Sequence, residues 1–120
     1  MRVAFTGHRD AVAADKERLI SIVTQLYAEG YRIFMSGMAE GFDLLAAEVV
    51  LSLKEELSEI KLVAVIPFEG HIAKVGSENR QRYNAICDSV DEVITLAPEY
   101  HEKAYYDRNV YRELRCSSRL

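Results

Sequence analysis

The residue types best suited to ligand chemistry lie in two glycine-containing segments, each of which follows a short apolar run. The first segment is Thr6-Gly7-His8-Arg9. Glycine lets the backbone approach a ligand closely, and the planar guanidinium of arginine matches the oxygens of a phosphate or carboxylate. The segment therefore suits a phosphate-facing turn. It suits equally a tight turn in which Arg9 is solvated and His8 bonds to backbone.

The second segment is Ser36-Gly37-Met38-Ala39-Glu40-Gly41-Phe42-Asp43, which leads directly into an apolar helix. Its backbone N–H groups can point at an anion, and the helix N-terminus adds positive potential there. The spacing matches neither G-x-G-x-x-G nor a P-loop. Asp43 suits a contact with a ribose hydroxyl, but the favoured role is a first-turn carboxylate that stabilises the helix dipole. Glu40 is interpreted as a solvated charge in preference to a general base.

A third segment, Pro67-Phe68-Glu69-Gly70-His71, follows another apolar run. Phe68 suits stacking on a base, and Glu69 or His71 suits a contact with a sugar. The favoured interpretation places Phe68 against the core and the other two side chains in water.

Polar and aromatic residues mark two later segments. In Glu78-Asn79-Arg80-Gln81-Arg82-Tyr83, Arg80 or Arg82 can reach a phosphate, but surface pairing with Glu78 is favoured. Four of the seven tyrosines fall within residues 100–111. This excess suits a base-stacking wall or a partner surface, and it suits equally the packing of a terminal helix on a sheet.

The elements that must position these residues alternate along the chain. Continuous apolar runs predict strands at residues 2–6, 32–36, 61–66 and 92–96. Helical spacing predicts helices that end near residue 29 and that span about 42–57, 77–88 and 102–114. The pattern predicts an α/β fold, namely a three-layer, Rossmann-like parallel sheet of about four strands with helices on both faces. Right-handed crossovers bring the loops after the strands to one sheet edge, where such folds bind ligands.

Length and composition set further limits. A chain of 120 residues, 49% of them hydrophobic, forms one domain spanning residues 1–120. Fifteen Lys and Arg against nineteen Asp and Glu give a net charge of −4, which argues against broad nucleic-acid binding. Cys87 and Cys116 show no metal-ligand spacing, and neither a signal peptide nor a membrane segment is evident. We therefore expect a cytoplasmic protein with free thiols and no metal.

Several motifs in order resemble the YpsA family of the SLOG superfamily, which also includes the Lonely Guy phosphoribohydrolases and DprA. They are T-G-H-R at 6–9, S-G-M-A-E-G-F-D at 36–43, I-P-F at 66–68, N-R-Q-R-Y at 79–83, D-E-V at 91–93 and Y-x-x-R-N at 105–109. The resemblance covers about residues 1–111. It implies a Rossmann-like fold with a nucleotide-type ligand over the strand ends, where Gly7, Arg9, Gly37, Gly41 and Asp43 face the ligand.

One departure from the family pattern affects the functional prediction. Family members continue after R-N into a fifth strand and a second glycine-rich G-G-T loop, which the sequence after Asn109 does not show. In the Lonely Guy enzymes the later loop supplies phosphate binding and the catalytic glutamate. Without a fifth strand, the sheet edge is expected to be shielded by the tail or paired with a second copy in a homo-oligomer.

Three functions follow from these observations. The first is a sensor or regulator that binds a small phosphorylated ligand, nucleotide or nucleotide-derived, without turnover. The second is an enzyme that cleaves the N-glycosidic bond of a nucleoside monophosphate, with Glu40 or Asp43 polarising water. The third is a protein-interaction module that uses the tyrosine-rich C-terminus. No catalytic residue and no cofactor are assigned. The predicted ligand-binding residues are Thr6, Gly7, His8, Arg9, Ser36, Gly37, Met38, Ala39, Gly41, Asp43, Pro67, Phe68, Arg80 and Tyr83.

Overall fold

The computed structural model describes residues 2–4, 14–115 and 118–119. Strands and helices alternate, as the apolar pattern predicts. The elements in chain order are β1 (Arg2–Ala4), α1 (Ala14–Ala28), β2 (Ile33–Ser36), α2 (Phe42–Leu53), β3 (Lys61–Ile66), a 3₁₀ helix (His71–Lys74), α3 (Ser77–Ser89), β4 (Glu92–Thr95), α4 (Ala104–Arg115) and β5 (Ser118–Arg119).

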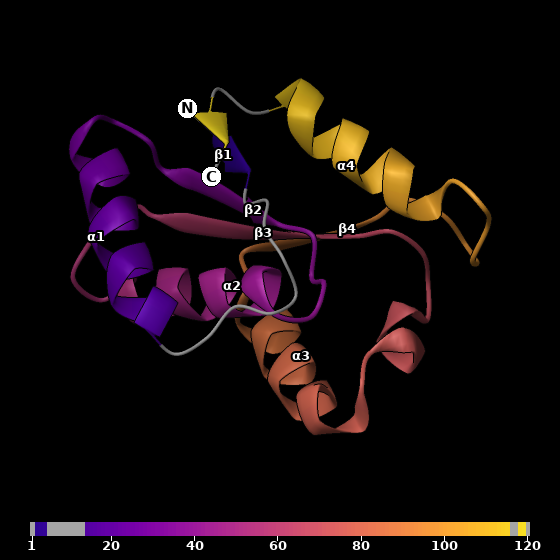
Figure 1. The fold of residues 1–120 in the computed structure, drawn as a ribbon. Coiled ribbons are helices and arrows are strands. Elements are labelled where there is room, and N and C mark those ends of the chain that lie inside the picture. The colour runs from indigo at the N-terminus through magenta and orange to yellow at the C-terminus, as the bar shows by residue number, and fades with distance from the viewer. Residues whose placement is uncertain (1, 5–13, 116–117, 120) are drawn as a thin grey trace.

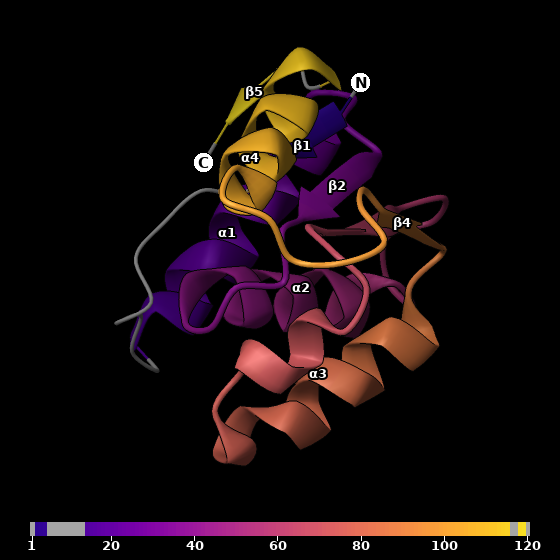
Figure 2. The ribbon, with the colours of Figure 1, turned by 90° about the vertical axis from the view of Figure 1, so that its right-hand side faces the viewer.

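The strands form one parallel sheet in the order β4-β3-β2-β1-β5. The first three crossovers step in one direction, so α1, α2 and α3 lie on the same face (Figure 1). The chain then returns from β4 to the far side of β1, which places α4 on the opposite face (Figure 2). The predicted three-layer α/β fold is confirmed.

A short fifth strand corrects one expectation. β5 pairs in parallel with β1, with Ser118 opposite Val3 and Arg119 opposite Ala4. The expectation of no fifth strand was therefore wrong, because two residues suffice to continue the hydrogen-bonding ladder without leaving an apolar run in the sequence. The tail itself extends the sheet at this edge.

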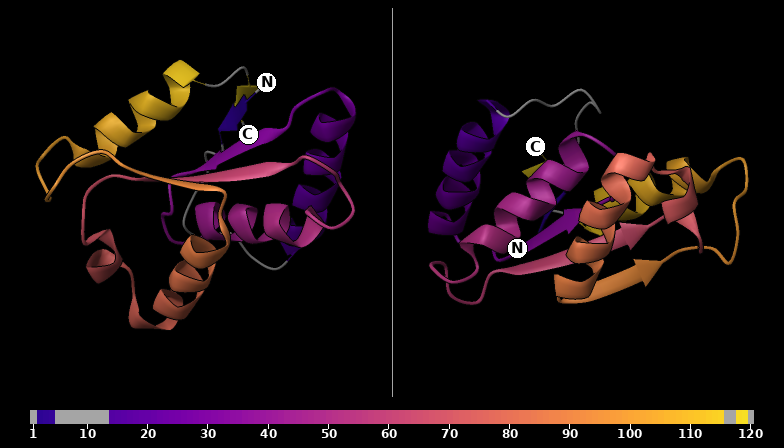
Figure 3. Two further views of the ribbon diagram at one scale, coloured as in Figure 1. Left: turned by 180° about the vertical axis from the view of Figure 1, so that it is seen from behind. Right: turned by 90° about the horizontal axis from the view of Figure 1, so that it is seen from below.

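The hydrophobic core lies between the sheet and the layer of three helices, which lie side by side across it (Figure 3). Phe34 and Leu62 from the sheet are fully buried against Leu44 and Val50 of α2. α2 is apolar on nearly every side because it packs between α1, α3 and the sheet. A smaller cluster, which includes Met35, Val63, Val65 and Tyr111, fills the other face beneath α4.

Two local differences from the predicted elements have local causes. α2 ends at Leu53, before the predicted residue 57, because the N–H of Lys54 bonds to the carbonyl of Leu51, three residues back, and a turn follows. The unpredicted 3₁₀ helix starts after Gly70, whose φ of 84° is accessible to glycine. Among the described residues, no helix is long and apolar enough to span a membrane.

Candidate functional site

A pocket of about 310 Å³ lies at the carboxyl ends of β2 and β3. We call it the strand-end pocket. The loop after β2, the segment that begins with the 3₁₀ helix, and the start of α4 converge on it, at the right-hand end of the sheet in Figure 1. It is lined by Ala39, Glu40, His71, Lys74, Val75 and Tyr105. Ligands of open parallel sheets bind at this edge.

A cluster of aromatic rings lies beside the strand-end pocket, and two of its members, His71 and Tyr105, line the pocket. Phe68 is 3% exposed and makes edge-to-face contacts with His71 and Tyr100, each at 5.4 Å between centroids. Tyr105 lies 6.1 Å from Phe68 and 5.9 Å from His71. The favoured interpretation of Phe68 as a core residue agrees with its burial, and the accessible part of the cluster is made by tyrosines.

His71 is buried, contrary to the expectation that it faces water. Its Nδ1 lies 3.0 Å from the hydroxyl of Tyr83, which is also buried. Burial lowers the pKa of His71 to about 4; the charge of Arg108 acts in the same direction and that of Glu40 in the opposite one. Burial also raises the pKa of Tyr83. The ring of His71 is therefore neutral at neutral pH.

Glu40 connects the loop after β2 to the start of α3. One carboxylate oxygen accepts the N–H of Gly76 at 2.9 Å, and the other accepts the side-chain amide of Asn79 at 2.8 Å. The interpretation of Glu40 as a merely solvated charge was wrong, because the chain brings two donors to it from residues 36 and 39 positions away.

The loop after β2 is held by buried charged groups. Asp43 accepts the N–H of Ala39 at 3.3 Å, and its carboxylate lies 3.6 Å from Arg112. Arg108 donates to the carbonyl of Gly37 at 3.1 Å. Burial raises the pKa of Asp43, whereas the charges of Arg112 and Arg108 act in the opposite direction. Burial lowers the pKa of Arg108, and the charge of Arg112 adds to this effect.

Gly37 is required by this arrangement of charges. A Cβ atom at residue 37 would lie 2.8 Å from Nη1 of Arg112 and 2.9 Å from Oδ2 of Asp43. The Ser36 hydroxyl donates to the carbonyl of Asp43 at 3.0 Å and accepts the N–H of Met38 at 3.2 Å. The anion that faces the N–H groups of this turn is therefore the chain's own Asp43.

The basic side chains near the pocket differ in the groups that they contact. Lys74 is exposed, and its ammonium lies 5.4 Å from the ring centroid of Tyr100. Arg80 donates to the carbonyls of Val75 and Ala73 and so fastens the end of the 3₁₀ helix. Arg82 pairs with Glu48 of α2, and not with Glu78 as favoured from the sequence.

The structure gathers some of the predicted ligand-binding residues and separates others from the pocket. Ala39 lines the pocket, whereas Tyr83 does not line it but contacts His71, which does. Several predicted residues are buried or half-buried behind the pocket without lining it: Ser36, Gly37, Met38, Gly41, Asp43, Pro67 and Phe68. Thr6, Gly7, His8 and Arg9 lie outside the described residues.

The sequence-based prediction omitted two deeply buried cations, Arg108 and Arg112. They are 7% and 4% exposed, and both face the loop after β2. One signal was available: arginines four residues apart share a face of a helix. The prediction also left Glu40, Lys74 and Tyr105 out of the site.

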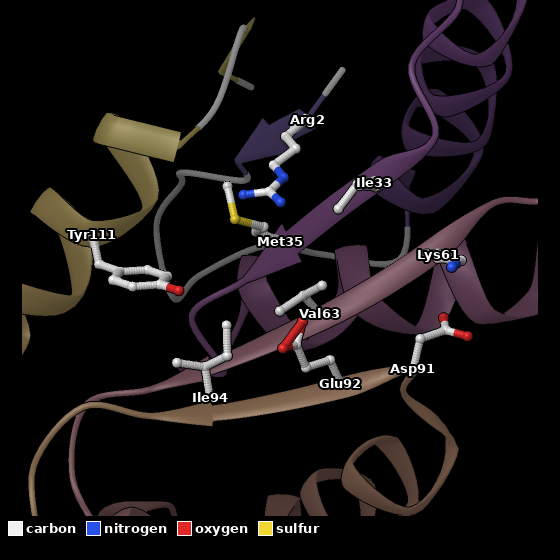
Figure 4. Close-up of a pocket in the computed structure, with 9 residues that line it drawn as sticks. All are labelled: Arg2, Ile33, Met35, Lys61, Val63, Asp91, Glu92, Ile94 and Tyr111. Carbon is white, nitrogen blue, oxygen red and sulfur yellow. The ribbon is translucent and has the colours of Figure 1, made fainter.

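A second hollow, of about 540 Å³, lies on the opposite face of the sheet, beside α4 (Figure 4). Met35 and Val63 form an apolar floor, and Tyr111 reaches over it from α4. Arg2 and Lys61 stand near the amino ends of the strands, away from the edge where such folds bind ligands. Among the residues that the structure describes, no group of three His, Cys, Asp or Glu side chains could hold a metal ion.

A comparison with protein families shows to which family the chain belongs. The model of the YspA SLOG family (YpsA) matches residues 3–112. The chain belongs to this family. A UPF0398 protein of Staphylococcus saprophyticus is 38% identical over 78 residues, which are 65% of this chain and 42% of that protein. A UPF0398 protein of Bacillus licheniformis is 31% identical over 88 residues, or 72% of this chain and 48% of that protein. This family member therefore aligns with less than half the length of these relatives.

Among solved structures, this family member is similar to DNA processing protein A from Helicobacter pylori. The TM-score is 0.59 at 18% identity, and the match covers 93% of this chain and 48% of that one. At this identity the likeness shows a shared fold. That protein binds single-stranded DNA. The expectation of no broad nucleic-acid binding is therefore contradicted: a net charge of −4 does not exclude such binding, because a local surface decides it.

Proposed function

We propose that the chain binds a nucleotide in the strand-end pocket and does so without turnover, as a sensor or regulator. One observation carries the proposal: the pocket places an exposed lysine, Lys74, and a partly exposed tyrosine, Tyr105, together at the carboxyl edge of a parallel sheet. The ammonium suits a phosphate, and the phenol ring suits a base. The volume of about 310 Å³ is that of a small ligand site.

The state of the nearby carboxylates supports binding in preference to hydrolysis. Asp43 is 5% exposed and lies against Arg112. Both oxygens of Glu40 accept hydrogen bonds from the protein. A general base must reach its proton and take it up, whereas these contacts hold both carboxyl groups in structural hydrogen bonds and an ion pair.

Calorimetric titration with AMP, ADP and ADP-ribose tests the proposal. We expect at least one of them to bind, and Lys74→Ala to weaken binding about tenfold, since a charged hydrogen bond to phosphate is lost. Lys16→Ala, which removes an exposed lysine from α1, is the matched control and should leave affinity unchanged. Absence of heat with all three nucleotides would refute the proposal.

A second candidate function is binding of single-stranded DNA, and exposed aromatic residues favour it. Tyr100 and Tyr106 are 52% and 66% exposed near the same sheet edge. Exposed rings beside cations suit successive stacked bases. Fluorescence anisotropy with a labelled thymidine oligonucleotide tests this candidate. Tyr106→Ala should weaken oligonucleotide binding and leave mononucleotide binding unchanged; equal effects on both would argue for one shared site, and no oligonucleotide binding would remove the candidate.

A further inference from the structure

We propose that His71 and Glu40 together bind the ribose hydroxyls of the nucleotide, and that Tyr83 is the positioning residue that orients the proton of His71. The inference rests on the proposed function, because it assigns the sugar within the strand-end pocket. It predicts a ligand class: ribonucleotides in preference to 2′-deoxyribonucleotides.

The contact with Tyr83 determines which nitrogen of the imidazole carries the proton. Among the described residues, the Tyr83 hydroxyl has one hydrogen-bond partner, Nδ1 of His71, at 3.0 Å. Tyr83 is 4% exposed, and a buried hydroxyl that does not donate leaves an unsatisfied proton. The hydroxyl therefore donates to Nδ1, and the neutral ring carries its proton on Nε2.

The surroundings of His71 determine where that proton points. His71 lines the strand-end pocket, which Tyr83 does not, and both residues line a separate hollow of about 260 Å³. Since Nδ1 is turned toward Tyr83, Nε2 is the nitrogen left for the strand-end pocket. No described side chain or backbone group accepts a hydrogen bond from it. His71 is only 4% exposed and lines the strand-end pocket, so a ligand bound in that pocket can supply the acceptor.

Glu40 lines the same pocket. Its oxygens are held by Gly76 and Asn79, which orient the carboxylate. Each carboxylate oxygen has two acceptor positions, so Glu40 can accept from a ligand as well as from the protein. A carboxylate accepts only, and it disfavours a phosphate beside it, which directs the phosphate toward Lys74.

His71 and Glu40 therefore present one fixed hydrogen-bond donor, Nε2 of His71, and one fixed acceptor, the carboxylate of Glu40. Adjacent ribose hydroxyls match this pair, since one hydroxyl accepts from Nε2 and its neighbour donates to Glu40. Loss of the 2′-hydroxyl removes one of these two hydrogen bonds, and a site built for hydrogen bonding discriminates against a ligand that lacks the hydroxyl. The edge of a base also carries donors and acceptors, so the test must separate sugar from base.

Two measurements test the inference on the full chain. Long-range ¹H–¹⁵N NMR of the ligand-free protein reads the tautomer of His71 directly; we expect the proton on Nε2, and a proton on Nδ1 would overturn the assignment. Calorimetry then compares AMP, 2′-deoxy-AMP and IMP. We expect AMP to bind at least tenfold more tightly than 2′-deoxy-AMP, and IMP to bind about as well as AMP.

Tyr83→Phe removes the hydroxyl that orients His71 and keeps the ring. We expect the ratio of AMP to 2′-deoxy-AMP affinity to fall toward one. Tyr27→Phe is the matched control, since it also removes one tyrosine hydroxyl bond, to the carbonyl of Ser58, and should leave the ratio unchanged. If Tyr83→Phe weakens both ligands equally, Tyr83 is merely structural and its positioning role is wrong.

The outcomes distinguish this inference from the proposed function. Equal affinity for AMP and 2′-deoxy-AMP in the unmodified protein refutes the ribose contact while nucleotide binding stands. Discrimination between AMP and IMP alone assigns the pair to the base. Absence of binding by AMP, 2′-deoxy-AMP and IMP refutes the ribose contact and leaves the tautomer result intact; the proposed function is refuted only when ADP and ADP-ribose also fail to bind.

Discussion

Arg112 lies 3.6 Å from the carboxylate of Asp43, and both side chains are almost completely buried, at 5% and 6% exposure. The contact joins α4, above the sheet, to the first turn of α2, below it (Figure 2). It also positions the loop that carries Ala39 and Glu40 into the strand-end pocket. The stability of the fold and the shape of the pocket therefore depend on the same ion pair.

Replacing Asp43 with Asn should destabilise the protein strongly. The substitution keeps the shape of the side chain but leaves the buried Arg112 and Arg108 without the countercharge of Asp43, a loss of about 3–5 kcal/mol in the free energy of unfolding. Urea unfolding measures it. The matched control is Glu48→Gln, which breaks the half-exposed pair with Arg82 and should cost less than about 1 kcal/mol. Equal losses in the two variants would show that the buried pair of Asp43 and Arg112 stabilises the fold no more than the half-exposed pair does.

Gly37→Ala should cost about 1–3 kcal/mol, because its Cβ would collide with the buried ends of Arg112 and Asp43. The cost should shrink when Arg112 is also replaced by Ala, since the double variant removes the obstructing guanidinium. Gly70→Ala is a useful comparison: its φ is +84° with no atom within 4 Å of a Cβ, so only backbone strain is expected. Additive losses at residues 37 and 112 would contradict the steric explanation.

Stability should fall as the pH is lowered through the range set by His71. Its pKa is lowered from 6.5 to about 4, so between these values the unfolded chain takes up a proton that the folded chain does not. The contribution of His71 to the free energy of unfolding is therefore fully present above pH 6.5. It falls by up to about 3 kcal/mol by pH 4, where His71 is protonated in both states. The difference between wild type and His71→Gln, measured by urea unfolding from pH 7 to 5, isolates this contribution. Parallel curves would rule it out.

Glu40→Gln should loosen the link between the loop after β2 and α3. Gly76 and Asn79 both donate hydrogen bonds to Glu40. In the glutamine variant an NH₂ group replaces one of the accepting oxygens, so two donors face each other at one of these contacts. We expect this to cost about 1–3 kcal/mol of the free energy of unfolding. Glu69→Gln, an exposed change near the same sheet edge, should stay within about 0.5 kcal/mol. Thermal unfolding followed by circular dichroism compares the two; an unaltered midpoint for Glu40→Gln would mean that these hydrogen bonds contribute nothing net.

The sequence by itself determined the layers of this protein. Apolar runs and helical spacing are local properties, so each strand and helix leaves its own pattern, and right-handed connections then order them along the sheet. The same local information located the loops at the ligand edge and, through their motifs, the family. β5 was missed because two polar residues carry no such pattern.

Only the tertiary structure decided which side chains meet within that edge. Arg108 bonds to Gly37 from 71 positions away, and His71 meets Tyr83 across twelve positions. Such pairs leave no periodic trace, because they depend on how α4 and α3 pack against loops from other parts of the chain. For the same reason, residue type alone did not show whether Asp43 and Glu40 face solvent or buried partners. The packing of the chain determined this.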